Sequence, residues 1–175
     1  PSCKTYRDYR LLLEREQLDL AIIATPDHHH IPAALHALAA GLDVYLEKPL
    51  SVCVAEGRLL CEAVRRTGRI LQVGSQQRSM EFNQYGCEFI RNGRLGQIHR
   101  VELPGYPGPL RTPNLTAEPL DGSLDWELFC GPTPLRNYHR QLWMKEDFRV
   151  GELLWRGWDL FEDYSGHLMT NWGAH

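Results

Sequence analysis

The triplet Glu47-Lys48-Pro49 places a lysine between a carboxylate and a proline, directly after a short apolar run. The proline restricts Lys48 to extended backbone conformations, which fixes the direction of its side chain. An amine held in a fixed direction can exchange a proton with a bound molecule. The alternative is an ordinary surface ion pair with Glu47, and the position at the end of a strand favours the first interpretation.

Three consecutive histidines, His28, His29 and His30, follow the first apolar run. Neighbouring loop residues rarely point at one ion, and neither an H-x-x-x-H spacing on a helix nor a cysteine pair lies nearby. We therefore expect no metal site, and we expect His28 and His29 to be exposed on the surface.

Three strand-like segments begin near Asp19, Asp43 and Arg69, which are 24 and 26 residues apart. This spacing is typical of βαβ units, in which a helix returns the chain to the same edge of a parallel sheet. The first segment, 18–25, is apolar almost throughout, so we expect it to be buried on both faces. The fold class is α/β, and the first half of the chain is part of a doubly wound domain with a parallel sheet.

The helices between these strands have start and stop signals. Residues 5–17 are expected to end an amphipathic helix. The helix over 31–41 carries Pro32 in its first turn, where proline is tolerated, and stops at a glycine. The helix over 52–67 has Ser51 as its N-cap and Gly68 as its stop.

The βαβ rhythm ends near residue 77, so we expect a domain boundary there, between residues 1–77 and 78–175. We expect a helix from Met80 to Asn92 with Ser79 as its cap, and a strand over 97–103 with one exposed face. Residues 104–124 are rich in proline and glycine and predict a long surface loop. A short helix or turn follows at 125–134.

The residues after each predicted strand are polar: 24–30, then Glu47-Lys48-Pro49, then 74–78. Ligands of open parallel sheets bind beyond the carboxyl ends of the strands. We therefore expect these three corners to form one rim, with Lys48 facing the place of a bound nucleotide.

The chain resembles the Gfo/Idh/MocA family of nicotinamide-dependent dehydrogenases, which act on sugars, inositols and related polyols. The resemblance rests on segments 6–52, 68–78, 89–103, 124–134 and 156–175, and above all on A-T-P-D-x-x-H and E-K-P in that order. It implies a partial Rossmann, dinucleotide-binding domain over 1–77, followed by the start of an α+β substrate and oligomerisation domain over 78–175. It implies a bound NAD, with NADP as the open alternative. It also implies a rim of cofactor-binding residues at the strand ends, namely Thr25, Pro26, His30, Glu47, Lys48, Pro49 and Gln76.

The resemblance also implies catalytic and substrate-binding residues. Lys48 matches the family's catalytic lysine, and His175 matches the histidine of its D-x-x-x-H motif. Here Asn171 replaces the aspartate of that motif, and an amide can orient a hydroxyl but cannot act as a base. Proton transfer therefore falls on Lys48 and His175.

Three further residues are candidates for the substrate pocket. Asp163 and His167 are four residues apart and are either a polar pair in the pocket or partners on a helix surface. Trp158 is either a packing residue or an aromatic platform for a sugar ring.

Composition excludes several classes of partner. The net charge is −3 and no run of Lys or Arg exceeds two residues, which argues against nucleic acid. No apolar stretch approaches the roughly 20 residues of a membrane span. The five cysteines are odd in number and widely spaced, so we expect free, mostly buried thiols. The family resemblance implies a small sugar or cyclitol as the partner and a homo-oligomer in the full-length form. The location is left open, with cytoplasmic as the default and an exported form as the alternative.

Pro1 and the position of His175 inside a motif indicate the central part of a longer protein. No G-x-G-x-x-G turn occurs in these residues, so we expect them alone to bind cofactor weakly or not at all and to expose a sheet edge. Two other functions stay open: an NAD-dependent glycosidase of the same fold, and a non-catalytic, truncated binding module.

Overall fold

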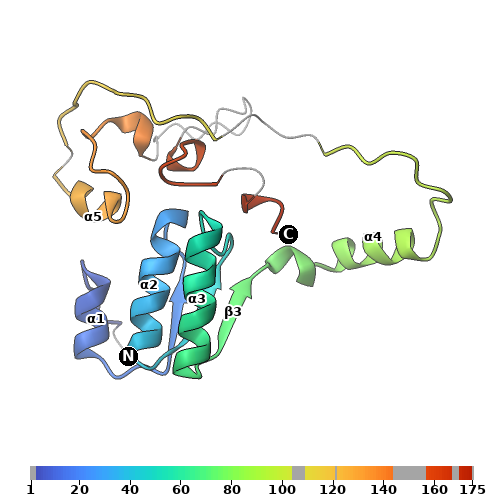
Figure 1. Ribbon diagram of the computed structural model, residues 1–175, viewed down its shortest axis with the longest axis horizontal. Coiled ribbons are helices and arrows are strands. Elements are labelled where there is room, and N and C mark those ends of the chain that lie inside the picture. Colours follow the sequence, from blue (N-terminus) through green and yellow to red (C-terminus); the bar gives the residue numbers. More distant parts are fainter. Residues whose placement is uncertain (1–2, 104–108, 121, 144–156, 167–169, 175) are drawn as a thin grey trace.

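The computed structural model describes residues 3–103, 109–120, 122–143, 157–166 and 170–174. The first half consists of α1 (Tyr9–Arg15), β1 (Leu20–Ile23), α2 (Asp27–Ala39), β2 (Asp43–Glu47), α3 (Val54–Thr67) and β3 (Leu71–Gly74). Figure 1 shows this layer with helices α2 and α3 side by side against the strands. The predicted α/β architecture is confirmed.

The sheet is parallel with the order β1-β2-β3. Ile23 pairs with Leu46, and Glu47 pairs with Gly74, so all three strands end at nearly the same level. Parallel strands need a crossover helix between them, and α2 and α3 supply the two crossovers. The predicted repeat of βαβ units therefore gives the topology directly.

One face of the sheet forms the core. Val44 and Leu46 of β2 and Ile23 of β1 pack against α2 and α3, and each is at most 7% exposed. The opposite face carries Leu20 and Ile22, which are 52% and 72% exposed. The expectation that the first strand is buried on both faces is therefore wrong for the described residues, because both helices cover the same face.

Two helix starts differ from the prediction. Helix α2 begins at Asp27, so Pro32 lies inside the helix and the three histidines belong to its first turns. Cys53, not Ser51, is the N-cap of α3, and the Ser51 hydroxyl donates to the Cys53 carbonyl instead. Gly68 ends α3 in the left-handed region, with φ of 66°, as expected.

After the sheet, the chain leaves the layer. A 3₁₀ turn (Gln76–Ser79) leads into α4 (Glu81–Arg91), whose N-cap is Met80 rather than Ser79. Figure 1 shows α4 and the segment after it extending away from the sheet. Residues 97–103 are exposed and form no strand, because no partner strand lies beside them among the described residues.

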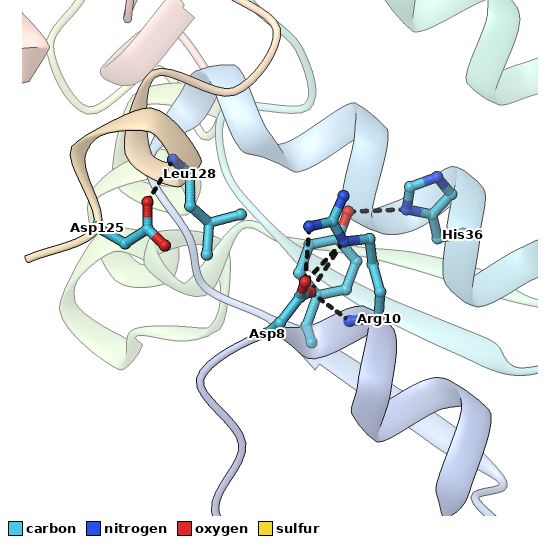
Figure 2. A network of polar contacts seen from close by, with 6 residues as sticks. Asp8, Arg10, His36, Asp125 and Leu128 are labelled. Atoms are coloured by element: carbon cyan, nitrogen blue, oxygen red, sulfur yellow. Dashed lines mark hydrogen bonds and ion pairs between the residues drawn. The ribbon is translucent and has the colours of Figure 1, made fainter.

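The second half forms an aromatic lobe, defined here as the described residues within 109–166. It contains α5 (Trp126–Cys130), where a short helix or turn was expected, and two 3₁₀ turns, Arg140–Leu142 and Trp158–Leu160. Asp125 caps α5 by accepting from the amide of Leu128, as Figure 2 shows. The hydrophobic core of the lobe is mostly aromatic and comprises Trp126, Phe129, Cys130, Leu142, Phe161 and Tyr164.

Residues 109–120 and 122–124 of the predicted loop contain no helix, and Leu110 forms an isolated bridge with Phe161. All five cysteines are free, but only Cys130 is buried, so the expectation of mostly buried thiols is wrong. Helices among the described residues are all too short or too polar to cross a bilayer.

Candidate active site

A buried imidazole joins the first two corners of the rim. The ring of His30 is 1% exposed, and its nitrogens lie 2.9 Å from the carbonyl oxygen of Thr25 and 2.6 Å from that of Pro49. Thr25 follows β1 and Pro49 follows β2. The ring therefore fixes the spacing between these two corners from below the surface.

The second and third corners meet through Glu47 and Gly74. The two residues are partners in the sheet register, and the Glu47 carboxylate lies directly over Gly74. A Cβ at Gly74 would lie 2.9 Å from this carboxylate, so a larger residue at this position would displace the Glu47 side chain. Gln76 lies just beyond, exposed on its 3₁₀ turn.

The predicted catalytic lysine contacts the C-terminal part of the chain. Lys48 Nζ donates to Asn171 Oδ1 at 2.5 Å, although the two residues are 123 positions apart. Both groups are partly buried. The structure thus brings together one residue predicted to be catalytic and one predicted to bind substrate, at the carboxyl end of β2.

Asp27 is a residue of this region that the sequence prediction missed. It lies in the first turn of α2, is 4% exposed, and accepts a hydrogen bond of 2.7 Å from the Ser165 hydroxyl. Burial raises the pKa of Asp27, while the Ser165 hydroxyl and the charges of His30 and Lys48 act in the opposite direction. The sequence signal for Asp27 was its position in A-T-P-D-x-x-H. Its contact with Ser165 becomes understandable only because α2 begins at Asp27.

The expectation that His28 and His29 are exposed is wrong, since the aromatic lobe packs on them. His28 is 3% exposed and His29 is partly buried, and both Nε2 atoms contact the carbonyl oxygen of Phe129, at 2.7 and 2.8 Å. Burial lowers the pKa of His28 to about 4. The described residues contain no group of three or more His, Cys, Asp or Glu arranged to hold a metal ion.

The remaining predicted pocket residues lie in the aromatic lobe or outside the described residues. Trp158 packs on the lobe's core, with its ring centroid 6.4 Å from that of His28. Asp163 accepts from Arg136 Nε at 2.6 Å, so its partner in the structure is an arginine. His167 and His175 lie outside the described residues.

The corner after β1 carries an unsatisfied polar group. Thr25 Oγ1 is buried without a hydrogen-bond partner among the described atoms, and Pro26 beside it is the N-cap of α2. Buried hydroxyls normally have a partner, so an oxygen in this position is suited to a bound ligand. The residues at this corner therefore fit a nucleotide cofactor.

Parallel βαβ units with polar corners on one rim define a Rossmann-type nucleotide-binding fold. Residues 1–75 match the Gfo/Idh/MocA family model, described as an oxidoreductase family with an NAD-binding Rossmann fold. Over this segment, the chain is similar to the Gfo/Idh/MocA oxidoreductases.

Several curated relatives are similar to the chain at about 30% identity. Inositol 2-dehydrogenase of Salmonella typhimurium is 32% identical over 54% of this chain and 28% of its own length. D-xylose 1-dehydrogenase (NADP(+)) of Hypocrea jecorina is 31% identical over 56% of this chain and 25% of its own length. Among solved structures, myo-inositol 2-dehydrogenase of Lactobacillus plantarum has a TM-score of 0.49 and 28% identity, covering 53% of this chain and 28% of that one. The chain therefore spans between a quarter and a third of the length of these relatives.

Proposed function

We propose that these residues form part of the active site of an NAD(P)-dependent oxidoreductase that acts on a hydroxyl carbon of a sugar or cyclitol. The contact between Lys48 Nζ and Asn171 Oδ1 is the observation that carries this proposal. It supports the proposal because an amine, which can exchange a proton, lies beside an amide, which can orient a hydroxyl, at the edge where ligands of parallel sheets bind. The names of the relatives, inositol and xylose dehydrogenases, support a polyhydroxylated substrate.

The cofactor would be held by the corners of the rim. The unpartnered Thr25 hydroxyl is a hydrogen-bonding group for it, and Glu47 and Gln76 belong to the corners at the ends of β2 and β3. When bound, a nicotinamide supplies the acceptor or donor of a hydride. His30 acts from beneath, since its buried ring holds the Thr25 and Pro49 corners in place.

Proton transfer is the task we assign to Lys48. In its neutral form, Lys48 Nζ can accept the proton of a substrate hydroxyl as that carbon is oxidised. Asn171 Oδ1 fixes the position of Nζ, and its amide nitrogen can donate to a neighbouring substrate oxygen. We further propose His175 as a second proton-transfer residue and residues 78–175 as the start of a substrate and oligomerisation domain.

The test is hydride transfer to NAD or NADP in the protein that carries these residues, with inositols and aldoses as substrates. Lys48→Ala is expected to abolish turnover and leave nicotinamide binding, measured by titration, within about threefold of wild type. A matched control, Lys4→Ala, changes a lysine that pairs with Glu16 far from the rim and keeps full turnover. Full turnover by Lys48→Ala would refute the assignment, and sugar release without net NADH would favour the glycosidase.

A further inference from the structure

A short stretch near the C-terminus is tied to the rim at both of its ends. At one end, the Ser165 hydroxyl donates to Asp27 Oδ2 at 2.7 Å, in the first turn of α2. At the other end, Asn171 Oδ1 accepts from Lys48 Nζ, after β2. The stretch therefore spans two corners of the rim, each through one side-chain hydrogen bond.

The bond between Ser165 and Asp27 is the more buried of the two. Ser165 is 1% exposed and Asp27 is 4% exposed, so water does not compete for either group. A buried carboxylate needs donors or positive charge nearby, and a hydrogen bond to a charged group is stronger than a neutral one. Here the donor is the Ser165 hydroxyl, and the electrostatic effects of His30 and Lys48 also lower the pKa of Asp27, against the effect of burial.

Gly166 and Thr170, one residue in from each end, lie against each other. A Cβ at Gly166 would collide with Thr170 Cγ2, so glycine at this position allows the close approach. Gly166 directly follows Ser165, and Thr170 directly precedes Asn171. The position of one end therefore limits the position of the other.

We propose that Asp27 and Ser165 form a clasp that positions Asn171 against the Lys48 amine. Asp27 is thus a positioning residue, which acts on Lys48 through Ser165 and the close contact of Gly166 with Thr170. The clasp has a specific consequence. When the hydrogen bond between Ser165 and Asp27 is lost, Asn171 moves away from Lys48, and Lys48 Nζ becomes more accessible to reagents in solution. This inference rests on the observed contacts of Lys48 and holds whether or not the chain transfers hydride.

The experiment measures the labelling rate of Lys48 by an amine-reactive acylating reagent, with peptide mass spectrometry. Ser165→Ala removes the donor without changing any charge, and the Lys48 labelling rate is expected to rise about fivefold or more. Lys4, which pairs with Glu16 on the surface, serves as the internal reference and keeps its wild-type rate. The matched control is Thr133→Val, which removes another hydroxyl hydrogen bond, to the Cys130 carbonyl, in the same lobe and leaves Lys48 labelling unchanged.

Asp27→Asn is the second variant, because it keeps an acceptor oxygen for the Ser165 hydroxyl. It is expected to show a smaller rise than Ser165→Ala, which distinguishes a clasp from a general loss of packing. If Ser165→Ala fails to fold by circular dichroism, Asp27→Ala compared with Asp27→Asn gives the same test. A bond that only stabilises the fold would lower the unfolding midpoint and leave Lys48 labelling at the wild-type rate in every variant, and that result would overturn the proposal.

Discussion

Lowering the pH should weaken the fold through a single buried imidazole, that of His28. In the folded chain, burial lowers the pKa of His28 from 6.5 to about 4, so the neutral ring is retained until the solution is strongly acidic. In the unfolded chain the same ring takes up a proton near its ordinary pKa. Between these two values the unfolded state binds more protons, so stability is lost as the pH falls.

The size of this loss follows from the two pKa values. A tenfold change in proton affinity corresponds to 1.36 kcal/mol, so the full loss between about pH 6.5 and pH 4 is on the order of 3 kcal/mol. About 2 kcal/mol of it should be reached by pH 5. Asp27 has a raised pKa and acts in the opposite direction, because the folded state then takes up a proton before the unfolded state does.

The assay is urea unfolding, followed by tryptophan fluorescence at about pH 7.5 and pH 5. His28→Gln keeps an N–H donor for the Phe129 carbonyl but cannot ionise. Its stability should therefore fall about 2 kcal/mol less between the two pH values than that of the wild type. This difference cancels the effect of Asp27, which both proteins share.

The matched control is His36→Gln, at an exposed histidine farther along α2 whose ring contacts the Tyr9 hydroxyl at 2.8 Å. Figure 2 shows His36 beside the Asp8 and Arg10 pair. This variant should lose as much stability as the wild type on acidification. The reasoning fails if His28→Gln loses as much stability at pH 5 as His36→Gln does.

Three further changes have defined outcomes. Gly131→Ala requires an alanine at φ of 51° and drives its Cβ into the imidazole ring of His29. We expect this variant to lose about 2 kcal/mol or more of its free energy of unfolding, measured by urea unfolding. Gly74→Ala should be destabilising in the wild type and much less so with Glu47→Ala, because the carboxylate it displaces is then absent; a double-mutant cycle measures the difference. Ile22→Ala should change stability by about 0.5 kcal/mol or less, whereas Ile23→Ala, on the buried face, should cost about 2 kcal/mol or more. Equal effects at the two isoleucines would contradict the described sheet.

The features that the sequence predicted correctly depend on local rules. The spacing of the strands requires crossovers of one length, and Gly68 supplies the left-handed residue that a helix end needs. The joining of the corners follows from the parallel sheet, since the carboxyl ends of parallel strands share one edge. No contact between distant segments had to be known for these predictions.

The features that were missed depend on packing between distant segments. His28 and His29 were expected on the surface because their neighbour Phe129, about a hundred residues later, is invisible to local patterns. Ile22 was expected to be buried because an apolar run gives no information about how many faces of a strand are covered. Asp27 was overlooked for the same reason, since its partner Ser165 lies 138 residues away.

The ring of His30 determines how the rim tolerates change. Because one rigid five-membered ring spans the turns that follow β1 and β2, the gap between those turns has a preset width. A change in either turn to suit a different ligand would therefore displace the other turn. Variants that bind a new ligand should thus carry changes in both turns. Engineering of this edge should therefore begin with the buried histidine beneath it.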